Sequence, residues 1–390
     1  MSYVDTHREL TGAFQEGRAS GPLDAGLVLH PRRFRSEEAE ARARLGASGG
    51  PPEPEAFQGR LERDADVEEN LDFPYRVLAP PGCTRGTRGV VLLHGLNERR
   101  WEKYLTWGKA LVDGLGVPVI LFPIAFHMER SPALWSDPRA MRQLSRERLR
   151  LLPGLEASSF ANAALSTRLH SHPERFLWAG LRTLRDLSRL SDLVRRGEEP
   201  LLDPEARLDL FAYSIGAFLA QVLLMADEGG RFTHSRLVSF CGGCVLSQTV
   251  PLAREILDSA AAGALHRFFE ELEAEKQRHP ELARRLAEGP AGRAFESLVA
   301  PERYPAEREA ALRRVGPRLS AIALGGDQVM PAGAVAATLA GSGARFERLD
   351  PPYRYDHANP FPLQGVDAAE VQRAFTTVFE RSVKWLGARD

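Results

Sequence analysis

Short, uninterrupted apolar runs alternate with longer amphipathic stretches along most of this chain, and this alternation constrains the fold more than any other feature. The runs VVLL at 90–93 and VILF at 119–122 are separated by residues 101–114, whose apolar side chains recur at helical spacing. Strands that are apolar at every position are typical of a parallel sheet covered by helices on both faces. The pattern predicts an α/β fold with a doubly wound, mostly parallel sheet and right-handed crossovers.

The same alternation continues toward the C-terminus. Further strands are expected at 208–213, 237–240 and 321–324, and helices at 174–196, 217–225 and 366–386. Upstream, FPYRVLAPPG at 73–82 predicts a short edge strand that ends in a Pro-Gly turn. We therefore expect the core of the fold to begin near residue 72.

The chain of 390 residues is long enough for a large core with additions. Residues 1–71 combine a short helical stretch near 7–15 with sequence rich in Pro, Gly and charged residues. They predict a loosely packed N-terminal extension to a core at 72–390. Two insertions, at about 128–173 and 246–317, are too long for simple crossovers. We interpret them as a lid or cap over a pocket, with surface decoration as the alternative.

Charge and composition limit the classes of partner. Lys and Arg number 51 against 52 Asp and Glu, so no overall attraction to nucleic acid or anionic membrane is expected, and a small-molecule substrate is favoured. The first residues lack an apolar signal core, no run approaches a membrane span, and the 3 cysteines fit a reducing compartment. These features predict a cytoplasmic protein and carry no signal for an oligomeric state.

The strongest local motif is Ala-Tyr-Ser-Ile-Gly at 212–216, which directly follows an apolar strand and directly precedes the helix AFLAQVLLM. A serine on so tight a strand-turn-helix junction has its hydroxyl exposed above the sheet, as a nucleophile requires. Gly216 provides the small flanking residue, whereas Ala212 stands where glycine is usual. Taken alone, Ser214 is equally consistent with a helix N-cap.

A carboxylate and an imidazole follow in a significant order. Asp327 comes after the apolar strand AIAL in a Gly-rich loop, and His357 lies in YDHANPFP. With the order Ser214, Asp327, His357, the chain resembles the α/β-hydrolase superfamily over roughly residues 72–387. The resemblance implies a nucleophile, an acid and a base in these three roles.

Simpler interpretations of the last two residues are a strand-end turn carboxylate and a loop histidine whose hydrogen bonds are satisfied. Asp350 and Asp356 are rival acids. A residue adjacent to the histidine is poorly placed to hold that same ring, so Asp327 is favoured.

The resemblance also implies an oxyanion hole formed by the backbone amides of Leu96 and Ile215. Leu96 belongs to His-Gly-Leu-Asn at 94–97, after the strand VVLL. His94 is expected to brace this loop rather than act as a second base. Candidates for contact with substrate are His94, Asn97, His127, Arg130 and Tyr213. For Arg130 a structural ion pair is favoured over binding of a substrate carboxylate.

Cys241 and Cys244 form a literal CxxC after a strand. A redox pair usually lies at a helix start, and a zinc site needs further ligands, so we interpret both as small buried residues beneath the pocket. The sequence contains no phosphate-binding Gly loop, no HExxH and no carboxylate cluster, and predicts no cofactor and no metal.

The expected activity is hydrolysis of a carboxylic ester or related acyl compound through an acyl-enzyme. An acyltransferase, or an amidase or peptidase, that uses the same three residues is the first alternative, since fold and triad determine the intermediate rather than the acceptor. A hydrolase-like scaffold that binds a ligand without catalysis is the second. The resemblance points to an uncharacterised bacterial branch of the superfamily.

Overall fold

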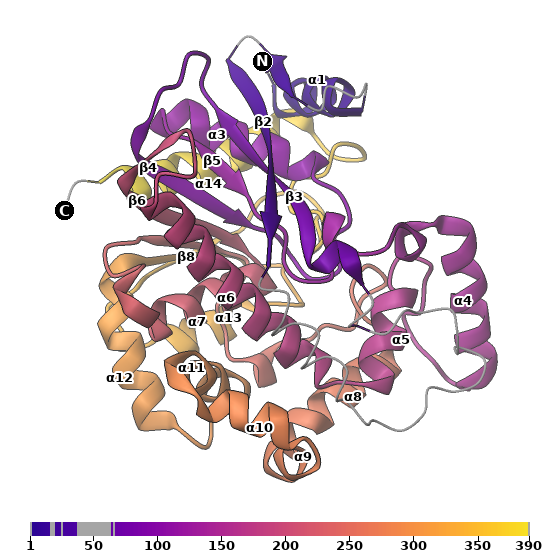
Figure 1. The fold of residues 1–390 in the computed structure, drawn as a ribbon. Coiled ribbons are helices and arrows are strands. Elements are labelled where there is room, and N and C mark those ends of the chain that lie inside the picture. Colours follow the sequence, from indigo (N-terminus) through magenta and orange to yellow (C-terminus); the bar gives the residue numbers. More distant parts are fainter. Residues whose placement is uncertain (1, 16–19, 25, 37–63, 65–66, 389–390) are drawn as a thin grey trace.

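The structure is a computed structural model that describes residues 2–15, 20–24, 26–36, 64 and 67–388. In this part of the chain nine strands form one sheet in the order β1-β2-β3-β5-β4-β6-β7-β8-β9 (Figure 1). The strands are β1 (Gly21–Asp24), β2 (Leu27–Arg35), β3 (Asp72–Ala79), β4 (Gly86–Leu93), β5 (Val119–Leu121), β6 (Leu202–Tyr213), β7 (Leu237–Phe240), β8 (Leu319–Leu324) and β9 (Arg345–Leu349).

The sheet is mostly parallel, which confirms the predicted fold class. Strands β5, β4, β6, β7, β8 and β9 pair in parallel, and β1, β2 and β3 join them by antiparallel pairing. The predicted strand at 237–240 has the same bounds as β7. Strand β9 was missed because its side chains, RFERL, are charged or partly exposed and give no continuous apolar run.

Helices cover both faces because successive side chains of a strand point to opposite sides. In β4, Val91 and Leu93 pack into one core, whereas Val90 and Leu92 pack into the other. The first core includes side chains of α6 (Arg175–Arg195), α7 (Ile215–Ala226) and α13 (Ala332–Leu339), and the second includes those of α1 (Tyr3–Gln15), α3 (Glu102–Leu115) and α14 (Ala368–Gly387).

The N-terminal residues belong to the sheet, which corrects two expectations. Strand β2 pairs with β3 from Val28 opposite Ala79 to Arg35 opposite Asp72, so β3 is not an edge strand. Tyr3 of α1 packs on Phe375, with ring centroids 4.5 Å apart. A loosely packed extension is therefore wrong for the described part of residues 1–71. The reason is that β2, LVLHPRRFR, buries only Leu27, Leu29 and Phe34 and therefore has no continuous apolar run. Residues 37–63 lie outside the described ranges.

Both long insertions are largely helical and pack on each other. The first contains η4 (Met128–Arg130), η5 (Ala133–Ser136), α4 (Pro138–Leu151) and α5 (Ala163–Ser171). The second contains η7 (Leu246–Gln248), α8 (Ser259–Glu270), α9 (Leu272–Arg278), α10 (Pro280–Ala287), α11 (Gly289–Val299) and α12 (Pro305–Val315). Helix α5 lies against α8, while α4 projects from the body of the molecule (Figure 1).

Three short 3-10 helices complete the described secondary structure: η3 (Glu68–Asn70), η6 (Glu228–Gly230) and η8 (Gly316–Arg318). Among the helices in the described ranges, none combines the length and the apolar character that crossing a membrane requires.

Candidate active site

Ser214 lies on the turn between β6 and α7, at the centre of the sheet. Its backbone angles, φ 58° and ψ −124°, fall in a region that non-glycine residues rarely adopt. A Cβ at Gly216 would come within 2.6 Å of the carbonyl oxygen of His94, so only glycine fits there. Ala212 is fully buried in β6 opposite Leu93 and has room for its methyl group. The departure from glycine at this position therefore leaves the turn intact.

A continuous hydrogen-bond chain leads away from Ser214. Its Oγ lies 2.7 Å from Nε2 of His357, and Nδ1 of the same ring lies 2.7 Å from Oδ2 of Asp327. The amides of Val329 and Met330 each donate to Oδ1 of Asp327 at 2.9 Å. The side chains of Ser214, His357 and Asp327 are all buried. The structure thus brings together the three residues that the sequence singled out.

The rival acids are engaged elsewhere. Asp356 accepts a hydrogen bond from the amide of Asn359, and Asp350 is paired with Arg348. Asp327 is the carboxylate at His357.

Tyr213, a candidate for substrate contact, borders the polar cavity beside Ser214 and supports the histidine. Its hydroxyl donates to the carbonyl oxygen of His357, and the two rings stack at 15° with centroids 5.3 Å apart. Burial raises the pKa of Tyr213 well above its usual range, so the phenol stays protonated as a donor. The ring is 1% exposed. Its role is to position His357.

His94 braces the loop after β4, as expected. Its Nδ1 lies 2.8 Å from the carbonyl oxygen of Gly95, and its Nε2 accepts from the amide of Ile124 at 2.9 Å, so the proton sits on Nδ1. Burial holds the pKa of His94 well below its usual range. Both nitrogens are engaged and the ring is fully buried, so His94 has no free ring nitrogen to offer a substrate.

Leu96 and Ile215 border the same cavity as Ser214. Ile215 is the first residue of α7, so its amide has no intrahelical acceptor. Leu96 follows Gly95, whose own amide donates to the hydroxyl of Tyr104 at 3.0 Å.

Asn97 ties the loop after β4 to both insertions. Its Nδ2 donates to the carbonyl oxygens of Ala161 at 2.9 Å and Glu255 at 2.7 Å. Its backbone has φ 62°. Because its donors are used in this way, Asn97 shapes the site rather than contacting a ligand through its amide.

Arg130 and His127, two further candidates for substrate contact, border neither of the two cavities that Ser214 borders. Arg130 is fully buried, contacts Asp186 at 2.7 Å and lies over the ring of Phe73. This is the structural ion pair that the sequence favoured. His127 is buried and uses Nδ1 toward the carbonyl oxygen of Ala125 at 2.9 Å. Burial lowers the pKa of His127 to about 3.

The CxxC cysteines are buried and free, which fits their interpretation as small interior residues. Cys244 Sγ lies 3.6 Å from the sulfur of Met330, and Cys241 precedes Gly242, where a Cβ would come within 2.5 Å of the carbonyl oxygen of Ser214. Within the described ranges no group of three His, Cys, Asp or Glu side chains is arranged to hold a metal ion.

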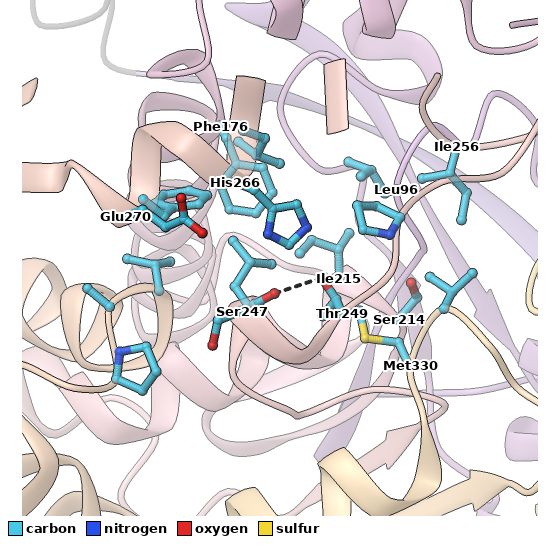
Figure 2. Close-up of a pocket in the computed structure, with 18 of the residues that line it drawn as sticks. Leu96, Phe176, Ser214, Ile215, Ser247, Thr249, Ile256, His266, Glu270 and Met330 are labelled. Atoms are coloured by element: carbon cyan, nitrogen blue, oxygen red, sulfur yellow. Dashed lines mark hydrogen bonds between the residues drawn. The ribbon is translucent and has the colours of Figure 1, made fainter. Parts of the chain in front are cut away.

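Two cavities meet at Ser214. The first, which we call the apolar cavity, has a volume of about 360 Å³. Its walls are mainly apolar, and they include Leu96, Phe176, Ile215, Ile256, Leu265 and Met330. Figure 2 shows Ser214 at one end of this cavity, with His266 and Glu270 toward the other.

The second, which we call the polar cavity, has a volume of about 350 Å³. It is bordered by Ser214 together with Glu98, Arg99, Trp135, Phe160, Glu255 and His357. The first insertion lines the polar cavity through Trp135 and Phe160. The second insertion lines the apolar cavity through Leu265 and both cavities through Ile256. Sequence reasoning missed these wall residues because each is an ordinary apolar side chain in a helix or loop.

A central parallel strand that leads into a serine turn, with the acid after β8 and the histidine after β9, defines the α/β-hydrolase fold. The chain belongs to the family described as "Family of unknown function (DUF6051)", which it matches over residues 56–387. No curated protein matches the sequence significantly.

Several solved structures are similar to this chain. A thermostable esterase from Pseudomonas putida is 12% identical, with 100% of this chain and 92% of that chain covered and a TM-score of 0.46. A cold-adapted esterase from an Arctic intertidal metagenomic library is 10% identical, with 94% and 97% covered and a TM-score of 0.43. An acylaminoacyl peptidase from Pyrococcus horikoshii is 12% identical, with 94% and 42% covered and a TM-score of 0.44.

Proposed function

We propose that this protein is a serine hydrolase that cleaves a carboxylic ester or related acyl compound through an acyl-enzyme. The observation that carries the proposal is the unbroken chain from Ser214 Oγ through His357 to Asp327, with both hydrogen bonds at 2.7 Å. The nucleophile stands on a strained turn that opens onto two cavities.

The first half of the reaction makes the acyl-enzyme. Ser214 Oγ attacks the carbonyl carbon of the substrate while His357 Nε2 accepts the hydroxyl proton. Asp327 fixes the ring through Nδ1 and stabilises the imidazolium, and its own charge is held by two backbone amides. The bond to the leaving oxygen then breaks, and that oxygen takes the proton from His357.

The second half releases the acid. Water attacks the acyl carbon and gives a proton to His357, the bond to Ser214 Oγ breaks, and Oγ takes that proton back. In both halves the amides of Leu96 and Ile215 are the proposed donors to the oxyanion. Loss of one such donor typically slows the reaction by about 10² to 10³.

The apolar cavity suits the acyl part of the substrate. It borders Leu96 and Ile215 as well as Ser214, so a carbonyl group bound by those amides has its acyl chain directed along walls such as Phe176 and Leu265. Burial of an apolar chain there is favoured by roughly 0.8 kcal/mol for each CH₂ group.

The test is covalent labelling with a fluorophosphonate probe. We expect the wild type to be labelled at Ser214, located by peptide mass, and Ser214→Ala to remain unlabelled. His357→Ala and Asp327→Asn are expected to slow labelling by about 10³ or more, because the hydroxyl then lacks an oriented base.

Ser247→Ala is the matched control, since Ser247 borders the same cavity outside the hydrogen-bond chain, and labelling is expected to persist. A folded wild type that never reacts would contradict the proposal and favour a binding scaffold. Once Ser214 is labelled, ester, amide and acyl-acceptor screens separate the esterase from amidase and acyltransferase activities.

A further inference from the structure

Arg99 borders the polar cavity beside Ser214 and His357, and none of the carboxylates that the structure describes forms an ion pair with it. Its Nη2 donates to Oδ1 of Asn97 at 3.0 Å, and its Nη1 lies 3.4 Å from Oγ of Ser131. Its buried Nε has no hydrogen-bond partner, and no carboxylate among the described residues lies within ion-pair distance. Loss of hydration lowers the pKa of Arg99 to about 10, so the guanidinium remains charged at neutral pH.

Arg99 is partly buried, and the fully buried arginines in the described ranges have carboxylate partners. Arg130 contacts Asp186 at 2.7 Å, and Arg148 contacts Asp258 at 2.6 Å. Removing a cation from water without an opposite charge costs free energy. A site that keeps such a cation at a cavity wall is suited to an anion that arrives with the ligand.

The other charged side chains described around the polar cavity do not neutralise the positive charge of Arg99. Glu98 is paired with Lys103 and accepts a hydrogen bond from the hydroxyl of Tyr104 at 2.9 Å. Arg100 is exposed and lies 3.9 Å from Glu102. Glu255 is exposed to solvent, where its charge is screened. The fixed charge that faces the interior of the cavity is therefore positive.

The proposed function determines which part of the substrate enters this cavity. The leaving oxygen must receive a proton from Nε2 of His357, so the leaving group lies on the side of that ring. Among the described residues, His357 borders the polar cavity and does not border the apolar one. The leaving group therefore meets Arg99.

We propose that the leaving group of the natural substrate carries a carboxylate that the guanidinium of Arg99 binds, so that the substrate class is an acyl ester of a hydroxy acid. This inference rests on the proposed hydrolase function. Each Nη nitrogen of Arg99 has a second hydrogen beyond the one it uses toward Ser131 or Asn97, and two such hydrogens match the two oxygens of a carboxylate, a geometry that lysine cannot reproduce. Trp135 and Phe160 supply apolar surface for the body of the leaving group.

The experiment compares two esters with one acyl group: 3-(butanoyloxy)benzoate and its methyl ester, which lacks the charge. The measured quantity is the ratio of kcat/KM for the charged ester to kcat/KM for the neutral ester. The intrinsic reactivity of the esters cancels when this ratio is compared between proteins. We expect Arg99→Gln to lower the ratio by about 10- to 100-fold, the range of a charge-assisted hydrogen-bond pair.

Two variants sharpen the result. Arg139→Gln removes the same charge from an exposed residue that borders neither cavity and is expected to leave the ratio within about twofold of wild type, because a solvated charge is screened. Arg99→Lys keeps the charge without the planar fork, so an intermediate ratio is expected. An equal ratio in Arg99→Gln and wild type would overturn the inference while the hydrolase proposal stands.

Arg99 also contacts Asn97 and Ser131, so its substitution can destabilise the protein. If the variant unfolds at low temperature, inhibition of the wild type is measured instead. There, 3-hydroxybenzoate is expected to inhibit at least about tenfold more strongly than 3-hydroxybenzamide, which has the same shape without the charge. Equal inhibition by the two compounds would overturn the inference. A wild type that neither labels at Ser214 nor turns over either ester would refute both proposals.

Discussion

His127 couples the stability of the folded state to pH through a single buried ring. Burial lowers its pKa to about 3 in the folded protein, whereas an unfolded chain has a histidine pKa of about 6.5. Below pH 6.5 the unfolded state therefore binds a proton that the folded state does not. The stabilising difference is fully present above pH 6.5 and is lost, at about 1.4 kcal/mol per pH unit, as the pH falls toward 3.

The prediction is tested with His127→Leu. At pH 7.5 this variant is expected to be less stable than wild type because the hydrogen bond to Ala125 is lost. By pH 4.5 the gap should narrow by roughly 2 to 3 kcal/mol, because only the wild type loses stability through this residue. Urea unfolding at both pH values measures the gap. For the exposed His234→Leu the gap should stay constant, and a constant gap for His127→Leu would show that the ring titrates normally.

The helices of the two insertions are joined by an ion pair in the interior. Arg148 of α4 donates to both carboxylate oxygens of Asp258 at 2.7 and 2.8 Å, and both side chains are fully buried. Asp258 also caps α8 by accepting from the amide of Ala261 at 3.0 Å. One side chain thus holds the start of α8 and its contact with the first insertion.

Arg148→Leu is expected to destabilise the protein by about 3 to 5 kcal/mol, since it leaves a buried carboxylate without its partner. Asp258→Asn keeps a side chain that can cap the helix. The double variant Arg148→Leu/Asp258→Asn should therefore lose less stability than the sum of the losses in the two single variants. Thermal unfolding measures all three proteins, with Arg146→Leu as an exposed control on the same helix. Strict additivity would mean that the pair does not act as a unit.

The whole sheet depends on its N-terminal strands, because β2 covers β3 along eight residue pairs. A chain that begins at residue 67 lacks α1, β1 and β2, and it exposes the hydrogen-bonding edge of β3 together with the surface that Tyr3 covers on Phe375. Exposed sheet edges pair with other chains. We expect this truncated protein to aggregate.

Size-exclusion chromatography of the soluble fraction measures that outcome. A shorter deletion, of residues 1–19, removes α1 but keeps β1 and β2, and is expected to stay monodisperse with a lower melting temperature. A monodisperse protein from residue 67 onward would show that the sheet is self-sufficient from β3.

Elements with a strong local signal were predictable from the sequence. The apolar run at 237–240 became β7, and the serine after the run at 208–213 stands on the turn into α7. The relation of Ser214 to Asp327 and His357 was accessible because each follows a recognisable strand or loop motif in a fixed order. These signals lie within a few residues of one another, where periodicity and turn chemistry act.

Roles that depend on contacts between distant segments were decided only by the tertiary structure. Arg130 and Asp186 are 56 residues apart, and nothing local to either one indicates the pair. No local signal indicates that β2 pairs with β3 or that the insertions contribute cavity walls. Nor does the sequence near Arg99 show that its Nε has no hydrogen-bond partner in the structure. The sequence by itself determined the fold class and the three residues proposed for catalysis, because short-range patterns encode them. The packing of distant segments decided the shape and charge of the space in front of Ser214, because burial and ion pairing are properties of the assembled chain.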